Sequence, residues 1–566
     1  MADPVAAIEA AIAADAAHAD PALWIFRVSD AEFRAQAATL AAEGPRGRAL
    51  WGVPVAVKDN IDVAGMPTTA GCPAYAYTPT EDAVCVARLR AAGAIVMGKT
   101  NLDQFATGLV GARSPYGIPR NVFDAARVPG GSSSGSGAAV AAGIVPIALG
   151  TDTAGSGRVP AMFGHIVGWK PTIGSVPATG AVPACRSVDT ISILARTVDA
   201  ARIVARVISG DDGNDPYSRI APHDHLARAD VPADVRVARI ATDDLDPGFA
   251  ELYAAAAKPF AGGTVDIAPF LAVARLLYDG PWVAERTAAL RKIVTEQPQT
   301  LHPITRKILE GGLARLTVDA FPAFDQAAAA RRLAAKLFST CDALLLPTTW
   351  PAPTLAELDA DPIGVNSRLG TWTNFVNLCD LAAIAVPCGM LADGRPVGVT
   401  VVGPAWSDGR IAAVADAIHR STAPSWGVDN PLDAVATPDA AGPGETALFC
   451  VGGHMAGLPL NSQITSLGGR FHRVAHTVPE YRLYGLGSRP GMVRAVPGAA
   501  IAGEVWVLPT TAIGTLLASV PPPLGFGTVT LDDGPCLGFL AEIQGLNDAP
   551  DITEHGGWRA FLSSRV

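Results

Sequence analysis

Residues 129–160 read PGGSSSGSGAAVAAGIVPIALGTDTAGSGRVP, and the rest of the chain is best understood from this stretch. Two polar clusters of Gly and Ser, at residues 130–137 and 150–157, flank the small apolar run 138–149. Such a run is typical of a tightly packed core helix that leads into a buried strand. Both clusters would then lie at element ends, where free backbone N–H groups can face a ligand.

Each cluster by itself favours a flexible turn or a phosphate cradle over a catalytic site. The phosphate cradle has little support, because no GxxxxGK[ST] motif is present and no Lys lies inside either cluster. A catalytic role therefore needs a second group from elsewhere in the chain.

The segment WGVPVAVKDNIDVAG, at residues 51–65, supplies Lys58 at the end of the apolar run 53–57. An unpaired ammonium is costly to bury, and one solution is a neutral Lys whose pKa is lowered by desolvation. A neutral Lys beside a Ser hydroxyl can act as a general base for nucleophilic catalysis. Lys99, which also lies at a strand-to-loop junction, is a second candidate base.

Over roughly residues 20–425 the chain resembles the amidase signature hydrolases, which use a Ser–cis-Ser–Lys triad. Lys58 matches the family's base, Ser132 the bridging serine after a cis peptide bond, and Ser156 the nucleophile. The separations, 74 residues from Lys58 to Ser132 and 24 from Ser132 to Ser156, are those that the family leads us to expect. The resemblance further implies an oxyanion hole from the backbone N–H groups of Thr153, Ala154, Gly155 and Ser156, with support for that loop, or an ordinary cap or turn, from Asp189 and Thr190.

Two further segments resemble the allophanate hydrolase branch of these amidases. In NLDQFATGLVG, residues 101–111, the resemblance implies that Gly108 contacts substrate through its backbone, whereas an ordinary loop glycine is the alternative. In YDGPWVAER, residues 278–286, it implies that Tyr278 and Arg286 hold a substrate carboxylate, a task that suits the planar fork of Arg. Spacing alone would favour a half-buried Tyr and a solvated Arg.

The resemblance therefore implies hydrolysis of allophanate, a urea that carries a carboxylate, to ammonia and CO₂ in urea degradation by way of N-carboxycarbamate. It also implies a homodimer, coupling to a biotin-dependent urea carboxylase, and neither a metal nor a cofactor. A general amidase, or the glutaminase-type component of a tRNA-dependent amidotransferase, would use the same triad on another substrate. A non-catalytic scaffold is the alternative from another class, and the filled triad positions argue against it.

The composition limits the class of protein. The 566 residues carry 43 Lys and Arg against 53 Asp and Glu, and this net charge of −10 argues against a surface for nucleic acid or anionic membrane. The eight Cys include no CxxC pair and indicate reduced core cysteines of an intracellular protein. The acidic N-terminus and the punctuated apolar runs predict a cytoplasmic protein without a membrane span.

Strand and helix patterns alternate over residues 46–110 and predict an α/β fold, in which a large mixed sheet is covered by helices on both faces. We expect this amidase signature domain to occupy residues 1–425 and to begin with a helical arm at residues 1–45. Pro, Gly, Ala and Asp dominate residues 426–445, which predicts a linker.

Residues 446–566 are predicted to form a small α+β domain with short strands. It resembles the accessory domain of allophanate hydrolases, itself similar to the γ-glutamylcyclotransferase fold, and could either hasten decarboxylation of N-carboxycarbamate or serve assembly alone. His454, in the VGGHMAG motif after the first strand, is the candidate for acid/base or binding work. His472 and His476 are further candidates, or part of an exposed cationic strand edge.

Overall fold

The chain divides into two compact units, which are described separately. The first comprises Met1–Ile220 and Ala229–Val435, and the second Ala221–Arg228 and Ala436–Val566. The division after residue 435 falls inside the stretch expected to be a linker. The structure is a computed structural model that describes residues 3–45, 48–221, 225–226, 231, 235–423, 425–427, 430–431, 441, 444–456, 458–532, 534–546 and 549–564.

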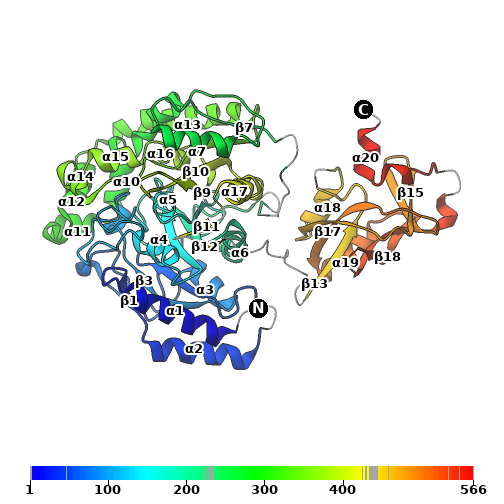
Figure 1. The fold of residues 1–566 in the computed structure, drawn as a ribbon, viewed down its shortest axis with the longest axis horizontal. Helices are drawn as coiled ribbons and strands as arrows, with labels where there is room; N and C mark the ends of the chain where they lie inside the picture. Colours follow the sequence, from blue (N-terminus) through cyan, green and yellow to red (C-terminus); the bar gives the residue numbers. More distant parts are fainter. Residues whose placement is uncertain are drawn as a thin grey trace. The chain divides into compact units, whose positions relative to one another are not determined.

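A ten-stranded mixed sheet forms the centre of the first unit (Figure 1). Its strand order is β1-β3-β2-β4-β6-β5-β9-β10-β8-β7, in which β2 pairs in parallel with both β3 and β4, β7 pairs in parallel with β8, and the other pairs are antiparallel. The predicted mixed sheet is thus confirmed. The strands are β1 Trp24–Arg27, β2 Pro54–Lys58, β3 Ile95–Thr100, β4 Ile147–Asp152, β5 Val167–Lys170, β6 Thr190–Ala195, β7 Val237–Ala238, β8 Ala343–Pro347, β9 Leu381–Met390 and β10 Pro396–Pro404.

Two groups of helices cover the sheet. α4 and α5 pack together, and α6 and α7 pack on α17; α5 and α17 both contact β9 and β10, so the two groups lie on opposite faces. The helices are α1 Pro4–His18, α2 Asp30–Glu43, α3 Val84–Ala91, α4 Ser134–Ala141, α5 Arg158–Phe163, α6 Val198–Ile208, α7 Pro247–Ala257, α8 Ala268–Ala274, α9 Leu276–Asp279, α10 Trp282–Ala289, α11 Arg291–Glu296, α12 Pro303–Leu313, α13 Ala320–Leu337, α14 Leu355–Ala360, α15 Gly364–Leu369, α16 Asn374–Leu378 and α17 Asp408–Thr422.

The N-terminal arm differs from the purely helical segment that we expected. α1 and α2 pack against each other, but β1 lies between them in the chain and pairs with β3 at the edge of the sheet. Its sequence, Trp-Ile-Phe-Arg, is rich in residues that favour strands, and the Ala-rich helices on either side obscured it. The arm is therefore part of the main fold.

The small-residue run forms the expected helix and strand. α4 is buried along its whole length, and a Cβ at Gly135 would lie 2.7 Å from both Asn101 N and Leu23 O. The absence of a side chain there lets the helix approach the neighbouring backbone. Because β2 and β4 are parallel neighbours, their carboxyl ends meet at one edge of the sheet. That edge carries Lys58 and Asp152.

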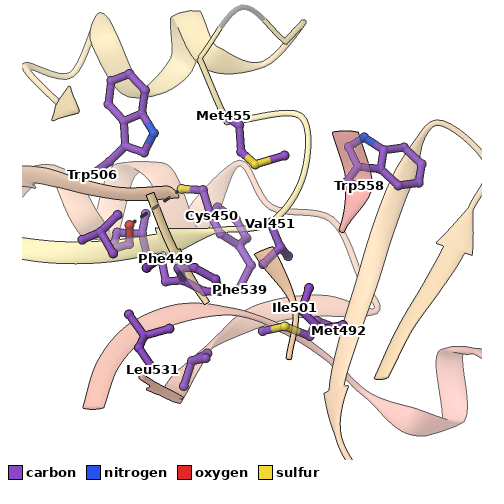
Figure 2. Packing of buried hydrophobic residues seen from close by; sticks show 14 of the residues in the cluster. Phe449, Cys450, Val451, Met455, Met492, Ile501, Trp506, Leu531, Phe539 and Trp558 are labelled. Carbon is purple, nitrogen blue, oxygen red and sulfur yellow. Dashed lines mark hydrogen bonds between the residues drawn. The ribbon is translucent and has the colours of Figure 1, made fainter. Parts of the chain in front are cut away.

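The second unit is a small α+β domain with a five-stranded sheet in the order β14-β17-β13-β19-β18 and a separate hairpin, β15–β16. Its core gathers Phe449, Val451, Met455, Trp506 and Phe539 (Figure 2). The elements are β13 Glu445–Cys450, α18 Asn461–Thr465, β14 Arg470–His476, β15 Tyr481–Leu486, β16 Arg489–Arg494, β17 Ala502–Pro509, α19 Thr510–Ala518, β18 Leu524–Leu531, β19 Gly534–Ala541 and α20 Trp558–Ser563; β11 Ser425–Trp426 and β12 Asn430–Pro431 pair before them.

Candidate active site

The amine of Lys58 lies against the bridging serine. Lys58 Nζ is 2.7 Å from Ser132 Oγ and 2.8 Å from Thr151 Oγ1, and the Lys58 side chain is completely buried. Burial lowers the pKa of Lys58 from 10.5 to about 7, and the nearby charge of Arg286 acts in the same direction. Near neutral pH a large fraction of this amine is therefore uncharged and able to accept a proton.

The two serines lie on adjacent segments. The Gly131–Ser132 peptide bond is cis, and Ser133 N donates to Ser156 O at 3.2 Å. Within the described residues no hydrogen bond joins Ser132 Oγ to Ser156 Oγ, so the Lys58–Ser132 half of the proposed relay is formed and the second half is not. Catalytic hydrogen bonds often tighten only when substrate binds.

The turn that carries Ser156 is organised by a carboxylate. Asp152 Oδ1 accepts from Gly155 N at 2.8 Å, and Asp152 Oδ2 accepts from Gly157 N at 3.1 Å. The N–H of Gly155, expected in the oxyanion hole, is thus already engaged and does not serve as a free donor here. The N–H groups of Thr153 and Ala154 have no acceptor in the described part of the chain, and they remain the candidates for holding an oxyanion.

A buried ion pair fixes that carboxylate. Arg158 Nη2 lies 2.8 Å from Asp152 Oδ1, and both side chains are fully buried. Burial alone would raise the pKa of Asp152, but the charge and hydrogen bonds of Arg158 outweigh it and hold that pKa below its usual value. Arg158 was not among the sequence candidates, although it follows the nucleophile by two residues.

α16 and the segment before β6 brace the same turn. Thr373 Oγ1 donates to Ala154 O at 2.6 Å, and Asn377 Nδ2 donates to Asp152 O at 2.8 Å. Thr153 Oγ1 donates to Asp189 Oδ1 at 2.5 Å, and Thr190 Oγ1 donates to Asp152 O at 2.7 Å. Sequence reasoning singled out Asp189 and Thr190 but gave Thr373 and Asn377 no role, because nothing local in α16 reveals a partner more than 200 residues away.

The loop that carries Gly108 is tied to the Ser132 segment. Asp103 N donates to Ser132 O at 3.1 Å, and the Asp103 carboxylate accepts from Gly111 N at 2.9 Å. A Cβ at Gly108 would lie 2.7 Å from Asp103 Oδ2, so a larger residue there would displace this carboxylate. The next residue, Leu109, donates its N–H to Asn366 Oδ1 at 2.8 Å. Gly108 therefore lies beside the triad.

Arg286 and Tyr278 also lie together, although α9 and α10 are separate helices. The Arg286 guanidinium carbon is 5.6 Å from the centre of the Tyr278 ring. Its Nη1 donates to Ala106 O at 3.1 Å and to Thr107 Oγ1 at 2.9 Å, next to Gly108. Nε and Nη2 have no oxygen or nitrogen partner in the described residues, although the guanidinium is fully buried. The expectation of a solvated Arg from spacing alone is wrong.

Lys99 has a different environment from that of Lys58. Its Nζ lies 3.3 Å from Asp59 Oδ1 and also contacts Pro67 O and Thr68 Oγ1. None of these partners is a serine of the triad. Lys99 is therefore a buried structural cation paired with a carboxylate, and the structure does not support it as an alternative base.

In the second unit, His454 lines a pocket of about 240 Å³. Its ring stacks on Phe539 with centroids 4.7 Å apart, and Nε2 lies 3.0 Å from Gln463 Oε1. Burial lowers the pKa of His454, so the imidazole is neutral over most of the physiological range. His472 and His476 lie on the edge strand β14 and do not line this pocket, which fits the strand-edge interpretation.

Glu504 was missed by sequence reasoning. It is 6% exposed on β17 and accepts from Ala456 N at 2.7 Å, in the loop that carries His454. It also accepts from Trp506 Nε1 and pairs with Arg559 at 2.6 Å. Its carboxylate therefore fixes the shape of the loop after β13.

Two features of the described residues bear on other classes of function. None of the helices there combines the length and the apolar character needed to cross a bilayer. Three or more His, Cys, Asp or Glu side chains are nowhere in that part of the chain grouped so as to hold a metal ion.

Comparison with protein families covers both units. The model of the Amidase family matches residues 6–412, and that of the allophanate hydrolase C-terminal domain matches residues 446–563. The solved structure of Kluyveromyces lactis allophanate hydrolase is similar, with a TM-score of 0.75 and 37% identity. The match covers 100% of this chain and 97% of that one.

Curated relatives fall into two groups. The urea amidolyase of Lachancea kluyveri is 40% identical over 577 residues, which is 96% of this chain and 31% of that protein. The chain thus spans about a third of the length of such relatives. A glutamyl-tRNA(Gln) amidotransferase component of Nitratidesulfovibrio vulgaris is 36% identical over 434 residues, which cover 69% of this chain and 87% of that protein.

Proposed function

Since this chain belongs to the amidase family and carries an allophanate hydrolase C-terminal domain, we propose that it hydrolyses allophanate. Ser156 attacks the amide carbonyl and its proton passes through Ser132 to Lys58. The same relay returns the proton to the leaving ammonia, and water then releases the acyl group as N-carboxycarbamate. The N–H groups of Thr153 and Ala154 hold the oxyanion, with about 3 kcal/mol of transition-state stabilisation for each donor.

The observation that carries this proposal is the buried guanidinium of Arg286. An uncompensated charge is costly in a protein interior, and Nε and Nη2 are left without an oxygen or nitrogen partner in the described residues. A substrate carboxylate would satisfy both nitrogens bidentately. The Gly108 loop and Tyr278 lie on either side of this position. A neutral amide would leave the cation unpaired, so the site favours a charged urea derivative.

A substrate pair tests this assignment. Arg286→Met should lower kcat/KM for allophanate by roughly 10- to 150-fold, since a hydrogen bond to a charged group contributes about 1.5–3 kcal/mol. Ammonia release from a neutral amide such as acetamide, slow in the wild type, should not fall. Ser156→Ala should abolish both reactions. Equal wild-type rates on allophanate and acetamide would instead favour a general amidase.

The amidotransferase component is the alternative that the curated relatives also offer. Those proteins match only about two thirds of this chain, and residues beyond 446 match the allophanate hydrolase C-terminal domain instead. A component of this kind would use glutamine as its ammonia donor. Ammonia release from glutamine at a rate similar to that from allophanate would support this alternative.

We further propose that His454 assists decarboxylation of N-carboxycarbamate. The ring lies in a pocket beside the backbone of Gly452 and Gly453, and a neutral imidazole can accept or donate a proton there. His454→Ala should leave the first ammonia release intact and slow CO₂ release, and His476→Ala, on the exposed strand edge, should change neither. Ammonia and CO₂ are followed independently. Unchanged CO₂ release by His454→Ala would leave the domain an assembly role.

The remaining proposals concern partners and location. The urea amidolyase relatives are about three times as long as this chain, which supports coupling to a biotin-dependent urea carboxylase that supplies allophanate. A homodimer and a cytoplasmic location remain proposals of the same kind. Allophanate turnover driven by urea, ATP and bicarbonate, in a mixture with such a carboxylase, would test the coupling.

A further inference from the structure

A pocket of about 320 Å³ lies between α8–α9 and α15–α16. Tyr278 forms part of its wall on one side, and Asn366 and Asn374 lie on the other. Each of these three residues is linked to the catalytic segments. Tyr278 lies under Arg286, and Asn366 accepts from the residue after Gly108. The pocket therefore adjoins the place where the substrate carboxylate is proposed to bind.

Asn374 connects this pocket to the nucleophile turn. It is the first residue of α16, and the preceding Thr373 donates through Oγ1 to Ala154 O at 2.6 Å. A Cβ at Gly155 would lie 2.4 Å from the same Thr373 oxygen, which shows how closely the turn and α16 approach. A side chain at position 374 is thus held at a fixed place relative to Ser156.

The carboxamide of Asn374 is buried without a partner. The residue is 9% exposed, and Oδ1 has no hydrogen-bond partner in the described residues. By contrast, Asn377 on the same helix donates to two carbonyls and accepts from Arg158. A buried polar atom without a partner is unusual in a folded protein and needs an explanation. Because Asn374 lines a pocket, a ligand that donates an N–H would supply one.

We propose that Asn374 is a specificity-determining residue whose Oδ1 accepts the bridging N–H of a ureido substrate. This inference rests on the proposed function, in which Arg286 holds the carboxylate and Ser156 attacks the amide carbonyl. The bridging nitrogen of allophanate lies between those two groups, so its N–H reaches the pocket wall that adjoins both. Gly370 makes room for this arrangement, since a Cβ there would lie 2.5 Å from both Asn374 Oδ1 and Nδ2.

Allophanate and malonamate isolate this one hydrogen bond. Both have a terminal amide and a carboxylate, but malonamate has a CH₂ in place of the bridging N–H. Asn374→Leu keeps a similar volume and removes the acceptor. It should lower kcat/KM for allophanate by roughly 5- to 150-fold, the range expected when a hydrogen bond to a buried group is lost. For malonamate it should change kcat/KM by less than about twofold.

The conservative variant separates recognition from structure. Asn374→Asp keeps an acceptor, and its added negative charge acts on both carboxylate substrates, so the ratio of the two kcat/KM values should stay near that of the wild type. Equal losses on both substrates with Asn374→Leu, or no loss on either, would overturn the proposal. Malonamate turnover shows that a variant has folded. Failure of the wild-type protein to hydrolyse allophanate would instead refute the proposed function.

Discussion

The burial of Lys58 determines the pH range in which this chemistry can run. Desolvation disfavours the charged ammonium and lowers the pKa of Lys58 to about 7, and the positive charge of Arg286 contributes in the same direction. Only the uncharged amine can take the proton of Ser132. The fraction of active enzyme should therefore grow as the pH rises through the pKa of Lys58.

We expect kcat/KM to fall about tenfold for each pH unit below about 7 and to level off above it, because protonated Lys58 is no base. Arg286→Met removes a positive charge that favours the neutral amine, so its profile should have a higher midpoint. The measurement uses a neutral amide, since loss of carboxylate binding then does not obscure the titration. A flat profile between about pH 5.5 and 8.5 would contradict this assignment of the base.

Residue-level prediction from the sequence succeeded where chemistry and spacing coincide. A charged residue that ends a buried strand is conspicuous, and Lys58 lies against Ser132 as its position suggested. Thr373 and Asn374 gave no comparable signal, because a Thr or Asn at the start of a short helix is ordinary. Their importance comes from the approach of α16 to a turn more than 200 residues earlier, which only the folded chain reveals.

At the scale of elements, the nucleophile turn is held from several sides. β4 ends on Asp152, whose carboxylate receives two backbone N–H groups and the guanidinium of Arg158. α16 adds Thr373 and Asn377 to the same turn. The turn therefore has little freedom before substrate arrives, as expected of a preorganised oxyanion site.

Removal of Arg158 should be far more costly than removal of a surface arginine. Arg158→Met leaves the Asp152 carboxylate buried without its counter-charge, and breaking such a pair costs about 3–5 kcal/mol. We expect a clearly lower thermal midpoint of the first unit, together with lost activity. Arg34→Ala is the control, since Arg34 and Glu9 are both 47% exposed, and its midpoint should stay unchanged. Equal midpoints for both variants would contradict this account.

Prediction of elements followed the same limit. The alternation of strand and helix was sufficient for the mixed sheet, but β1 was hidden between Ala-rich helices and α7 lies in a Pro- and Asp-rich stretch that showed little pattern. The expected continuous face from Tyr278 to Arg286 is instead two helices, α9 and α10, separated at Gly280. The two side chains still meet, because the second helix packs back onto the first.

At the scale of the whole molecule, the two units have separate cores and separate candidate sites. Composition alone predicted a large α/β enzyme without a nucleic-acid surface, and the change of composition after residue 420 indicated a second unit. No such signal could reveal which surface of the first unit is used for assembly. That depends on apolar side chains that the folded chain leaves exposed.

The segment from α12 to α13 exposes an unusual set of apolar residues. Leu316, Val318 and Phe321 are 64%, 67% and 64% exposed, and they form with Leu313 and Phe324 what we name the α12–α13 patch. Phe324 also packs edge-on against Trp282, 5.6 Å away, on the helix that carries Arg286. Exposed apolar clusters of this kind mark interaction sites.

We propose that a second copy of this chain covers the α12–α13 patch. Arg315 and Asp319 lie within it and form no ion pair in the described part of the chain, so a two-fold arrangement can set the Arg of one copy against the Asp of the other. Phe321→Asp should convert a dimer to a monomer in light scattering after gel filtration. Val496→Asp, at an 81% exposed apolar residue of the second unit, should remain dimeric. A monomeric wild type, or a dimer that persists in Phe321→Asp, would refute this interface.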